Sequence, residues 1–143
     1  MDYQGKLTKK AVSVKVDEMH REVLHWKSCL QFIQDELTFI KQLLNSYVFE
    51  PNTPNLFERL QDYKAQIKKS NTNLDVITEK IGNHEHSISG LLECTDTVCD
   101  TFYHQKHEKL KAETVAYLEM FKDLKYEIFE YAGGILKKRK PDF

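Results

Sequence analysis

The residues of this chain best suited to metal or acid–base chemistry are its histidines, and carboxylates stand near most of them. Imidazole is a common ligand of zinc and iron, and carboxylate oxygens complete iron or manganese sites. Glu22 and His25 stand at i and i+3, a spacing at which two ligands project from one face of a helix. The histidines are His20, His25, His84, His86, His104 and His107. Whether they meet depends on the elements that carry them.

A heptad pattern predicts the first of these elements. Apolar residues recur at alternating spacings of four and three, and they are Met19, Val23, Trp26, Leu30, Ile33, Leu37, Ile40, Leu44 and Tyr47. Such a spacing keeps one stripe on one face of a helix, which the period of two in a strand does not. The pattern therefore predicts a helix over about 14–48.

A turn and a second helix follow. Pro51 and Pro54 cannot continue a helix, and Thr53 before Pro54 is typical of an N-cap followed by proline at the first helical position. The heptad spacing then returns as Leu56, Leu60, Tyr63, Ile67, Ser70, Leu74, Ile77, Ile81, His84, Ile88 and Leu91. These positions predict a second helix over about 54–92, in which Ser70 and His84 interrupt the apolar stripe.

The position of the second turn has alternatives. Thr95 and Asp96 offer N-caps where the second stripe ends, whereas Gly82–Asn83 or Gly90 would break the chain earlier and give a four-segment bundle. The heptad phase continues unchanged through residues 81–91, so the later turn is favoured. The third stripe is Tyr103, His107, Leu110, Thr114, Tyr117, Phe121, Leu124, Ile128 and Tyr131. It predicts a helix over about 97–133, closed by a glycine C-cap at Gly133–Gly134.

These elements predict an all-α fold, an antiparallel three-helix bundle of long, coiled-coil-like helices. The predicted domain covers residues 14–136, after a flexible extension at 1–13 and before a basic tail at 137–143. At 143 residues the chain is long enough for one domain.

Folding the chain about turns near residues 51 and 95 gathers the histidines in one half of the bundle. His84 comes level with His107, and His20, Glu22 and His25 lie close to that height. One hypothesis is therefore an Fe, Mn or Zn site formed by His84, His107, His20, Glu22 and His25. Di-iron bundles take inward-facing ligands from four helices, whereas only His84 and His107 occupy stripe positions here. The favoured interpretation is a polar core layer, and a pH-sensitive layer is a further alternative.

The first helix carries a second apolar stripe that its heptad pattern does not require, formed by Cys29, Phe32, Phe39 and Leu43. Exposed apolar faces usually mark partner interfaces, so we expect self-association, as a homodimer, or docking of a protein partner. The alternative is that a three-helix bundle needs wider core faces, which these residues would supply. Val115, Leu118 and Phe129 are weaker extra apolar positions on the third helix.

Charge and composition argue against several classes of function. With 21 basic and 22 acidic residues, no global field draws the protein to nucleic acid or membrane. The stretch Lys137–Lys140 complements a helix dipole, with contact to phosphate groups of nucleic acid or lipid as the weaker alternative. No apolar signal core or membrane span is seen, which favours the cytoplasm. No catalytic signature is present, so we expect a protein that is not an enzyme.

The cysteine count is odd, at three, and fits neither a disulfide framework nor a zinc site. Reduced thiols are therefore expected. Cys94 and Cys99 flank the second turn, however, and a tight turn would bring them within disulfide distance. A redox switch at this turn is the alternative.

Overall fold

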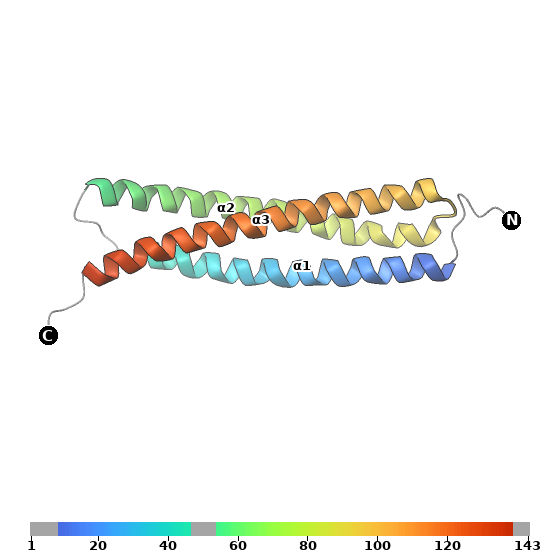
Figure 1. The fold of residues 1–143 in the computed structure, drawn as a ribbon, viewed down its shortest axis with the longest axis horizontal. Coiled ribbons are helices and arrows are strands. Elements are labelled where there is room, and N and C mark those ends of the chain that lie inside the picture. The colour runs from blue at the N-terminus through green and yellow to red at the C-terminus, as the bar shows by residue number, and fades with distance from the viewer. Residues whose placement is uncertain (1–8, 47–53, 139–143) are drawn as a thin grey trace. The chain divides into compact units, whose positions relative to one another are not determined.

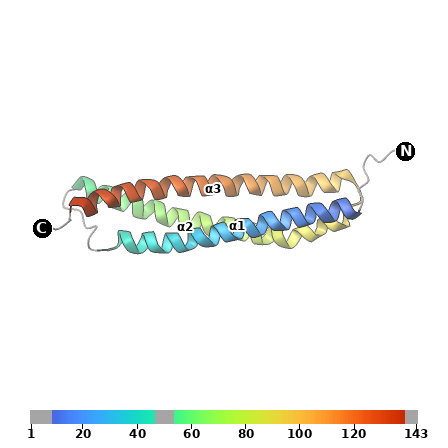
Figure 2. The ribbon, with the colours of Figure 1, turned by 60° about the horizontal axis from the view of Figure 1, so that its bottom comes forward.

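The computed structural model describes residues 9–46 and 54–138, and these residues form helices without any strand. Helix α1 spans Lys9–Leu44, α2 spans Pro54–Ile88, a short 3-10 helix η2 spans Ser89–Glu93, and α3 spans Thr97–Lys138. The three long helices pack against one another (Figures 1 and 2). The predicted all-α three-helix bundle is confirmed.

The chain forms two compact units, and each takes a stretch from all three helices. Unit 1 comprises Met1–Gln31 and Asp75–Ala116, and unit 2 comprises Phe32–Leu74 and Tyr117–Phe143. In each unit, segments far apart in the sequence therefore pack around a core of their own.

The heptad stripes form these cores. Every predicted stripe residue in the described part of the chain is buried, except the half-buried Leu56, Tyr103 and Leu124. Tyr47 lies outside the described residues. Burial of one apolar side chain contributes about 1.5–3 kcal/mol, so the repeated stripe residues are the main favourable term for this fold.

Ser70, which interrupts the second stripe, places its hydroxyl against a buried tyrosine of α3. The Tyr117 hydroxyl donates to the Ser70 carbonyl oxygen at 3.0 Å and lies 3.1 Å from Ser70 Oγ. A buried hydroxyl without a partner costs about 1–3 kcal/mol, and this pairing avoids that cost in unit 2.

The later of the possible turns is the one that forms. α2 continues through Gly82, and its last turn tightens into η2 before the chain reverses. Asp96 Oδ1 then accepts a hydrogen bond of 2.9 Å from the Cys99 backbone N–H, as an N-cap does at the start of α3. The four-segment alternative is wrong because the stripe residues Ile81, His84 and Ile88 are all buried, which keeps α2 helical across Gly82.

Both ends of the predicted domain are more helical than expected. α1 already begins at Lys9, inside the predicted flexible extension at 1–13, because Val12 and Val16 continue its buried stripe. α3 continues through Gly133 and Gly134 to Lys138, so the predicted C-cap and helix end at 133 are wrong. Ile135 keeps the stripe spacing after Tyr131 and is buried, which offsets a glycine cost of about 1 kcal/mol per residue.

Candidate functional site

His84 of α2 and His107 of α3 form a hydrogen-bonded pair in the core of unit 1. His84 Nε2 lies 2.8 Å from His107 Nδ1, and both side chains are buried. Each stands at a stripe position, so its helix directs the imidazole ring inward. The structure thus brings together the two histidines that the heptad pattern places level with each other.

Two residues of α1 complete this arrangement, which we call the histidine layer: Trp26, Glu22, His84 and His107. The Trp26 ring stacks on His107 with 4.8 Å between centroids, and Glu22 Oε2 lies 3.6 Å from His107 Nε2. This carboxylate lies beyond hydrogen-bond distance, and its negative charge favours a proton on His107 Nε2 by electrostatic attraction. In the neutral ring Nδ1 then accepts, so the Nε2–H group of His84 donates.

Burial keeps both histidines uncharged. Desolvation lowers the pKa of His84 from 6.5 to about 4, and electrostatic interactions with His107, Lys106 and His20 act in the same direction. Desolvation also lowers the pKa of His107, against the opposing effect of Glu22. At pH 7 the pair is therefore neutral, as a hydrogen-bonded polar core layer requires.

The other predicted metal ligands lie apart from this pair to different degrees. His20 is half-buried and close enough to affect the pKa of His84, whereas His25 is exposed, with its Nε2 3.6 Å from Cys29 Sγ. Within residues 9–46 and 54–138, no group of three or more His, Cys, Asp or Glu side chains is arranged to hold a metal ion. Metal binding by His84, His107, His20, Glu22 and His25 stays a prediction.

The second apolar stripe of α1 is largely uncovered. Phe32 is 63% exposed and Phe39 is 57% exposed, while Leu43 is half-buried beside them. These three residues, which we call the phenylalanine face, share one side of the helix in unit 2 because they stand seven and four positions apart. Cys29, the fourth predicted residue, is half-buried in unit 1.

An ion pair marks where the phenylalanine face borders α3. Lys125 Nζ lies 2.8 Å from Glu36 Oε2, and Glu36 stands between Phe32 and Phe39 along α1. Phe129 follows Lys125 by one helical turn and is also exposed. The apolar surface of unit 2 therefore extends from α1 towards α3 around one ion pair.

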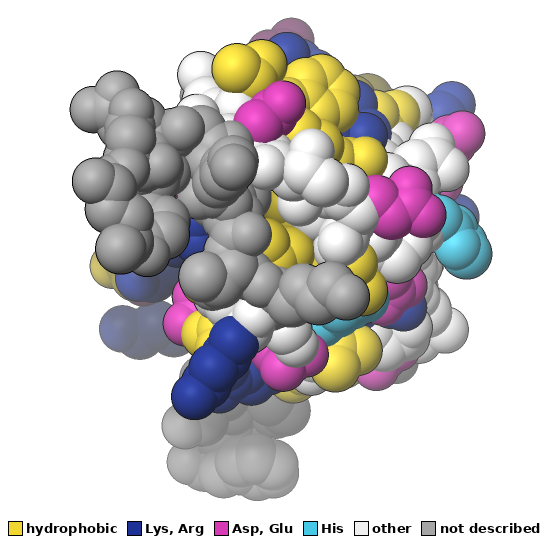
Figure 3. Space-filling view, turned by 90° about the vertical axis from the view of Figure 1, so that its right-hand side faces the viewer, with side chains coloured by type: hydrophobic (Ala, Val, Ile, Leu, Met, Phe, Trp, Pro, Cys, Tyr) yellow, Lys and Arg dark blue, Asp and Glu magenta, His cyan; other side chains and the backbone are white. Residues whose placement is uncertain are grey.

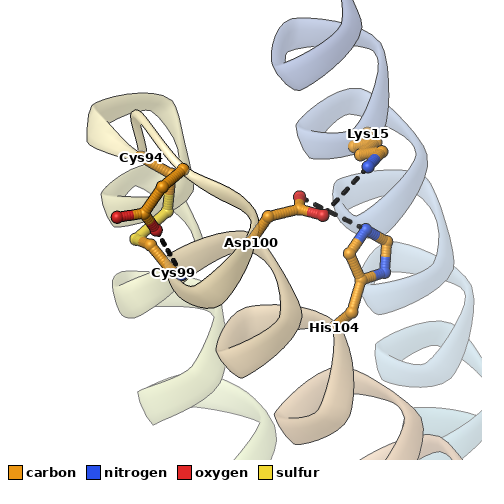
Figure 4. Close-up of a disulfide and its surroundings, with 6 residues drawn as sticks. Lys15, Cys94, Cys99, Asp100 and His104 are labelled. Carbon is orange, nitrogen blue, oxygen red and sulfur yellow. Dashed lines mark hydrogen bonds and ion pairs between the residues drawn. A yellow bond between two sulfur atoms is a disulfide. The ribbon is translucent and has the colours of Figure 1, made fainter. Parts of the chain in front are cut away.

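The second turn holds a disulfide, so the prediction of reduced thiols is wrong for two of the three cysteines. Cys94 and Cys99 are bonded, with 5.5 Å between their Cα atoms (Figure 4). The Asp96 cap bends the chain here and brings the two cysteines together. Cys29 is the free cysteine of the described chain.

Next to the disulfide lies a buried carboxylate that the sequence analysis missed. Asp100 accepts from Lys15 Nζ at 3.1 Å and lies 3.6 Å from His104 Nε2 (Figure 4). The signal was present, because Asp100 precedes Tyr103 by three positions and so extends the third stripe backwards. Figure 3 views the molecule from the side that is on the right in Figure 1 and shows hydrophobic side chains interspersed with acidic, basic and histidine side chains.

No protein-family model, curated protein or solved structure matches this chain. No described helix is long and apolar enough to cross a membrane.

Proposed function

We propose that this protein is a non-enzymatic interaction module that associates with a second copy of itself through the phenylalanine face of α1. The observation that carries the proposal is the exposure of two large aromatic rings, Phe32 at 63% and Phe39 at 57%, on one side of one helix. Exposed aromatic side chains at such a spacing are typical anchors of helix docking.

The alternative, that these residues widen the core, does not account for their exposure. The core of unit 2 is already filled from α1 by Ile33, Leu37 and Ile40, each at most 5% exposed. A residue that widens the core would be covered by a neighbouring helix, as the half-buried Leu43 is in part. More than half of each phenylalanine surface is left to a partner.

A second copy is a suitable partner because the face complements itself. Two identical apolar strips can pair about a twofold axis, which is the commonest symmetry of homodimers. Each phenylalanine ring then buries its apolar surface against the other copy, at about 25 cal/mol per Å². The Glu36–Lys125 ion pair, whose carboxylate stands between Phe32 and Phe39 along α1, would be enclosed by such a contact as a preformed pair.

The test replaces Phe32→Glu together with Phe39→Glu. In about 500 mM salt, which screens contacts between charged surfaces, light scattering on a size-exclusion column should give a dimer mass for the unmodified protein and a mass near 16.9 kDa for the variant. Circular dichroism should show the same helicity for both, because neither ring belongs to the core. Leu24→Glu, at another exposed apolar position of α1, is the matched control and should remain dimeric. A monomeric mass for the unmodified protein at every concentration would rule out self-association.

A further inference from the structure

Unit 2 contains a groove of about 1040 Å³ between α1 and α2. None of the residues that line this groove belongs to the phenylalanine face. Its floor is apolar and formed by Leu37, Leu44 and Ile67. Its sides carry amide, hydroxyl and ammonium groups from both helices, namely Gln34, Thr38, Lys41, Gln42, Asn45, Lys64, Lys68, Asn71 and Thr72. No residue of α3 lines the groove, so the chain's own third helix leaves it open.

The groove carries charge of one sign only. Lys41, Lys64 and Lys68 line it, and no aspartate or glutamate does. Within the described residues, no ion pair joins these three ammonium groups to a carboxylate, in contrast to Lys125, which is paired with Glu36. An acidic partner with some apolar surface would therefore match both the sides and the floor.

The same chain carries such a surface on α3. Glu119, Asp123, Glu127 and Glu130 are exposed and stand four, four and three positions apart. At about 100° per residue, these four carboxylates share a helix face about 120° wide with Met120 and Tyr126. We call this face the acidic face. The basic residues of α3 between positions 119 and 130 lie outside it. Met120 and Tyr126 are 66% and 67% exposed, so apolar groups are available beside the carboxylates.

The two surfaces also agree in length. The groove runs along α1 from Gln34 to Asn45, and the acidic face runs along α3 from Glu119 to Glu130. Both spans therefore measure about 17 Å at 1.5 Å per residue. We infer that the groove between α1 and α2 seats the acidic face of α3 from a second copy of this chain.

A helix fits the groove better than a nucleic acid or another polyanion does. The described groove residues include no arginine to chelate phosphate and no aromatic ring to stack on a base. The chain as a whole has no positive excess, with 21 basic against 22 acidic residues. The amide groups and the apolar floor instead suit a surface that mixes carboxylates with Met120 and Tyr126.

This contact is separate from the one through the phenylalanine face. It joins two different surfaces, so each copy can offer a groove to one neighbour and an acidic face to another. Salt weakens it by screening, whereas contact between phenylalanine rings resists salt. The two contacts can therefore fail independently and be told apart.

The test is a charge exchange on the full chain, with mass measured by sedimentation at about 20 mM and about 500 mM salt. One variant carries Lys64→Glu with Lys68→Glu, and the other carries Glu119→Lys with Asp123→Lys. Each alone should lose the salt-sensitive association, because two charges of one surface are reversed and no longer attract the opposite charges of the other surface. An equimolar mixture of the two should regain it, since the reversed charges in the groove of one variant attract the reversed charges on the face of the other.

Two further variants make the outcome specific. Lys69→Glu with Lys122→Glu changes the net charge by as much as the groove variant does, at exposed lysines outside both surfaces, and should keep the association. Phe32→Glu with Phe39→Glu should lose the salt-resistant association through the phenylalanine face and keep the salt-sensitive association through the groove. Masses that do not depend on salt in the unmodified chain, or failure of the mixture to recover, would overturn the inference. Retention of a polyanion such as heparin without self-association would assign the groove to another ligand.

Discussion

His84 Nε2 of α2 lies 2.8 Å from His107 Nδ1 of α3, in a layer where Trp26 stacks on the second ring. The pair is stable only while both rings are uncharged, because a proton added to either would place a cation among buried groups. Glu22 of α1 lies 3.6 Å from His107, and Lys111 of α3 lies 3.2 Å from the same carboxylate. The ammonium group of Lys111 therefore offsets part of the stabilisation that Glu22 would give to a protonated His107.

The histidine layer predicts a loss of stability in mild acid. The pKa of His84 is about 4 in the folded protein and near 6.5 in the unfolded chain, so the unfolded chain binds more protons between these values. The free energy of unfolding should therefore fall as the pH falls from 6.5 towards 4. The shift corresponds to about 3 kcal/mol, and the lowered pKa of His107 acts in the same direction.

Urea unfolding followed by Trp26 fluorescence at several pH values measures this effect, because Trp26 is the one tryptophan of the chain. His84→Gln should make the fall between pH 6.5 and pH 4 shallower. His86→Gln, at an exposed neighbouring position, should leave the pH dependence unchanged. Equal pH dependence in the unmodified protein and His84→Gln would contradict the assignment to the histidine layer.

Tyr117→Phe tests the polar contact in the core of unit 2. The substitution removes the hydroxyl that donates to the Ser70 carbonyl oxygen and leaves buried Ser70 without this partner. We expect the free energy of unfolding to fall by about 1–2 kcal/mol. Tyr126→Phe, which changes an exposed hydroxyl on the same helix, should have almost no effect. A similar, small change in both variants would show that the Ser70 contact contributes little.

Gly133→Ala and Gly134→Ala distinguish a continuing helix from a C-cap. Both glycines lie within α3, and a Cβ atom added at either meets no atom within 4 Å. Alanine should therefore raise the free energy of unfolding by up to about 1 kcal/mol at each position. If one of these glycines instead took the left-handed conformation of a C-cap, alanine would lower stability there. Thermal unfolding of the two single variants gives the sign directly.

The disulfide predicts a specific pattern of thiol reactivity. Iodoacetamide should alkylate one cysteine of the denatured, unreduced protein, Cys29, and all three after reduction. Intact-mass spectrometry counts the added groups, and Cys29→Ser should show none before reduction. Cys94→Ser with Cys99→Ser should lower stability by about 2 kcal/mol, because the closed loop is short. Alkylation of all three cysteines without reductant would contradict the bond.

The periodic features of this fold could be predicted from the sequence, whereas features that depend on distance could not. Residues such as Val23, Ile40 and Ile128 follow from heptad spacing alone, and the same spacing aligned His84 with His107. The end of α3 was predicted at Gly133 because glycine is a frequent C-cap, but burial of Ile135 dominates. Heptad spacing gives the position of a residue along its helix, but it does not give the distance between two helices or two side chains.

The same limit explains the rest of the candidate sites. The disulfide depends on how sharply the turn at Asp96 bends, which composition does not specify. The groove depends on short side chains such as Thr38 and Thr72 on adjacent helices. The phenylalanine face was found because Phe32 and Phe39 depart from the stripe in a regular way.

The most direct test of the proposed self-association is hydroxyl-radical footprinting of the unmodified protein over a range of concentrations, with oxidation read by mass spectrometry at single phenylalanines. Phe57 and Phe102 are exposed on α2 and α3, at 52% and 60%, and serve as internal references. We expect oxidation of Phe32 and Phe39 to fall relative to these references as the concentration rises. Constant relative oxidation of all four rings, while the mass stays at that of one chain, would contradict the proposed role of the phenylalanine face.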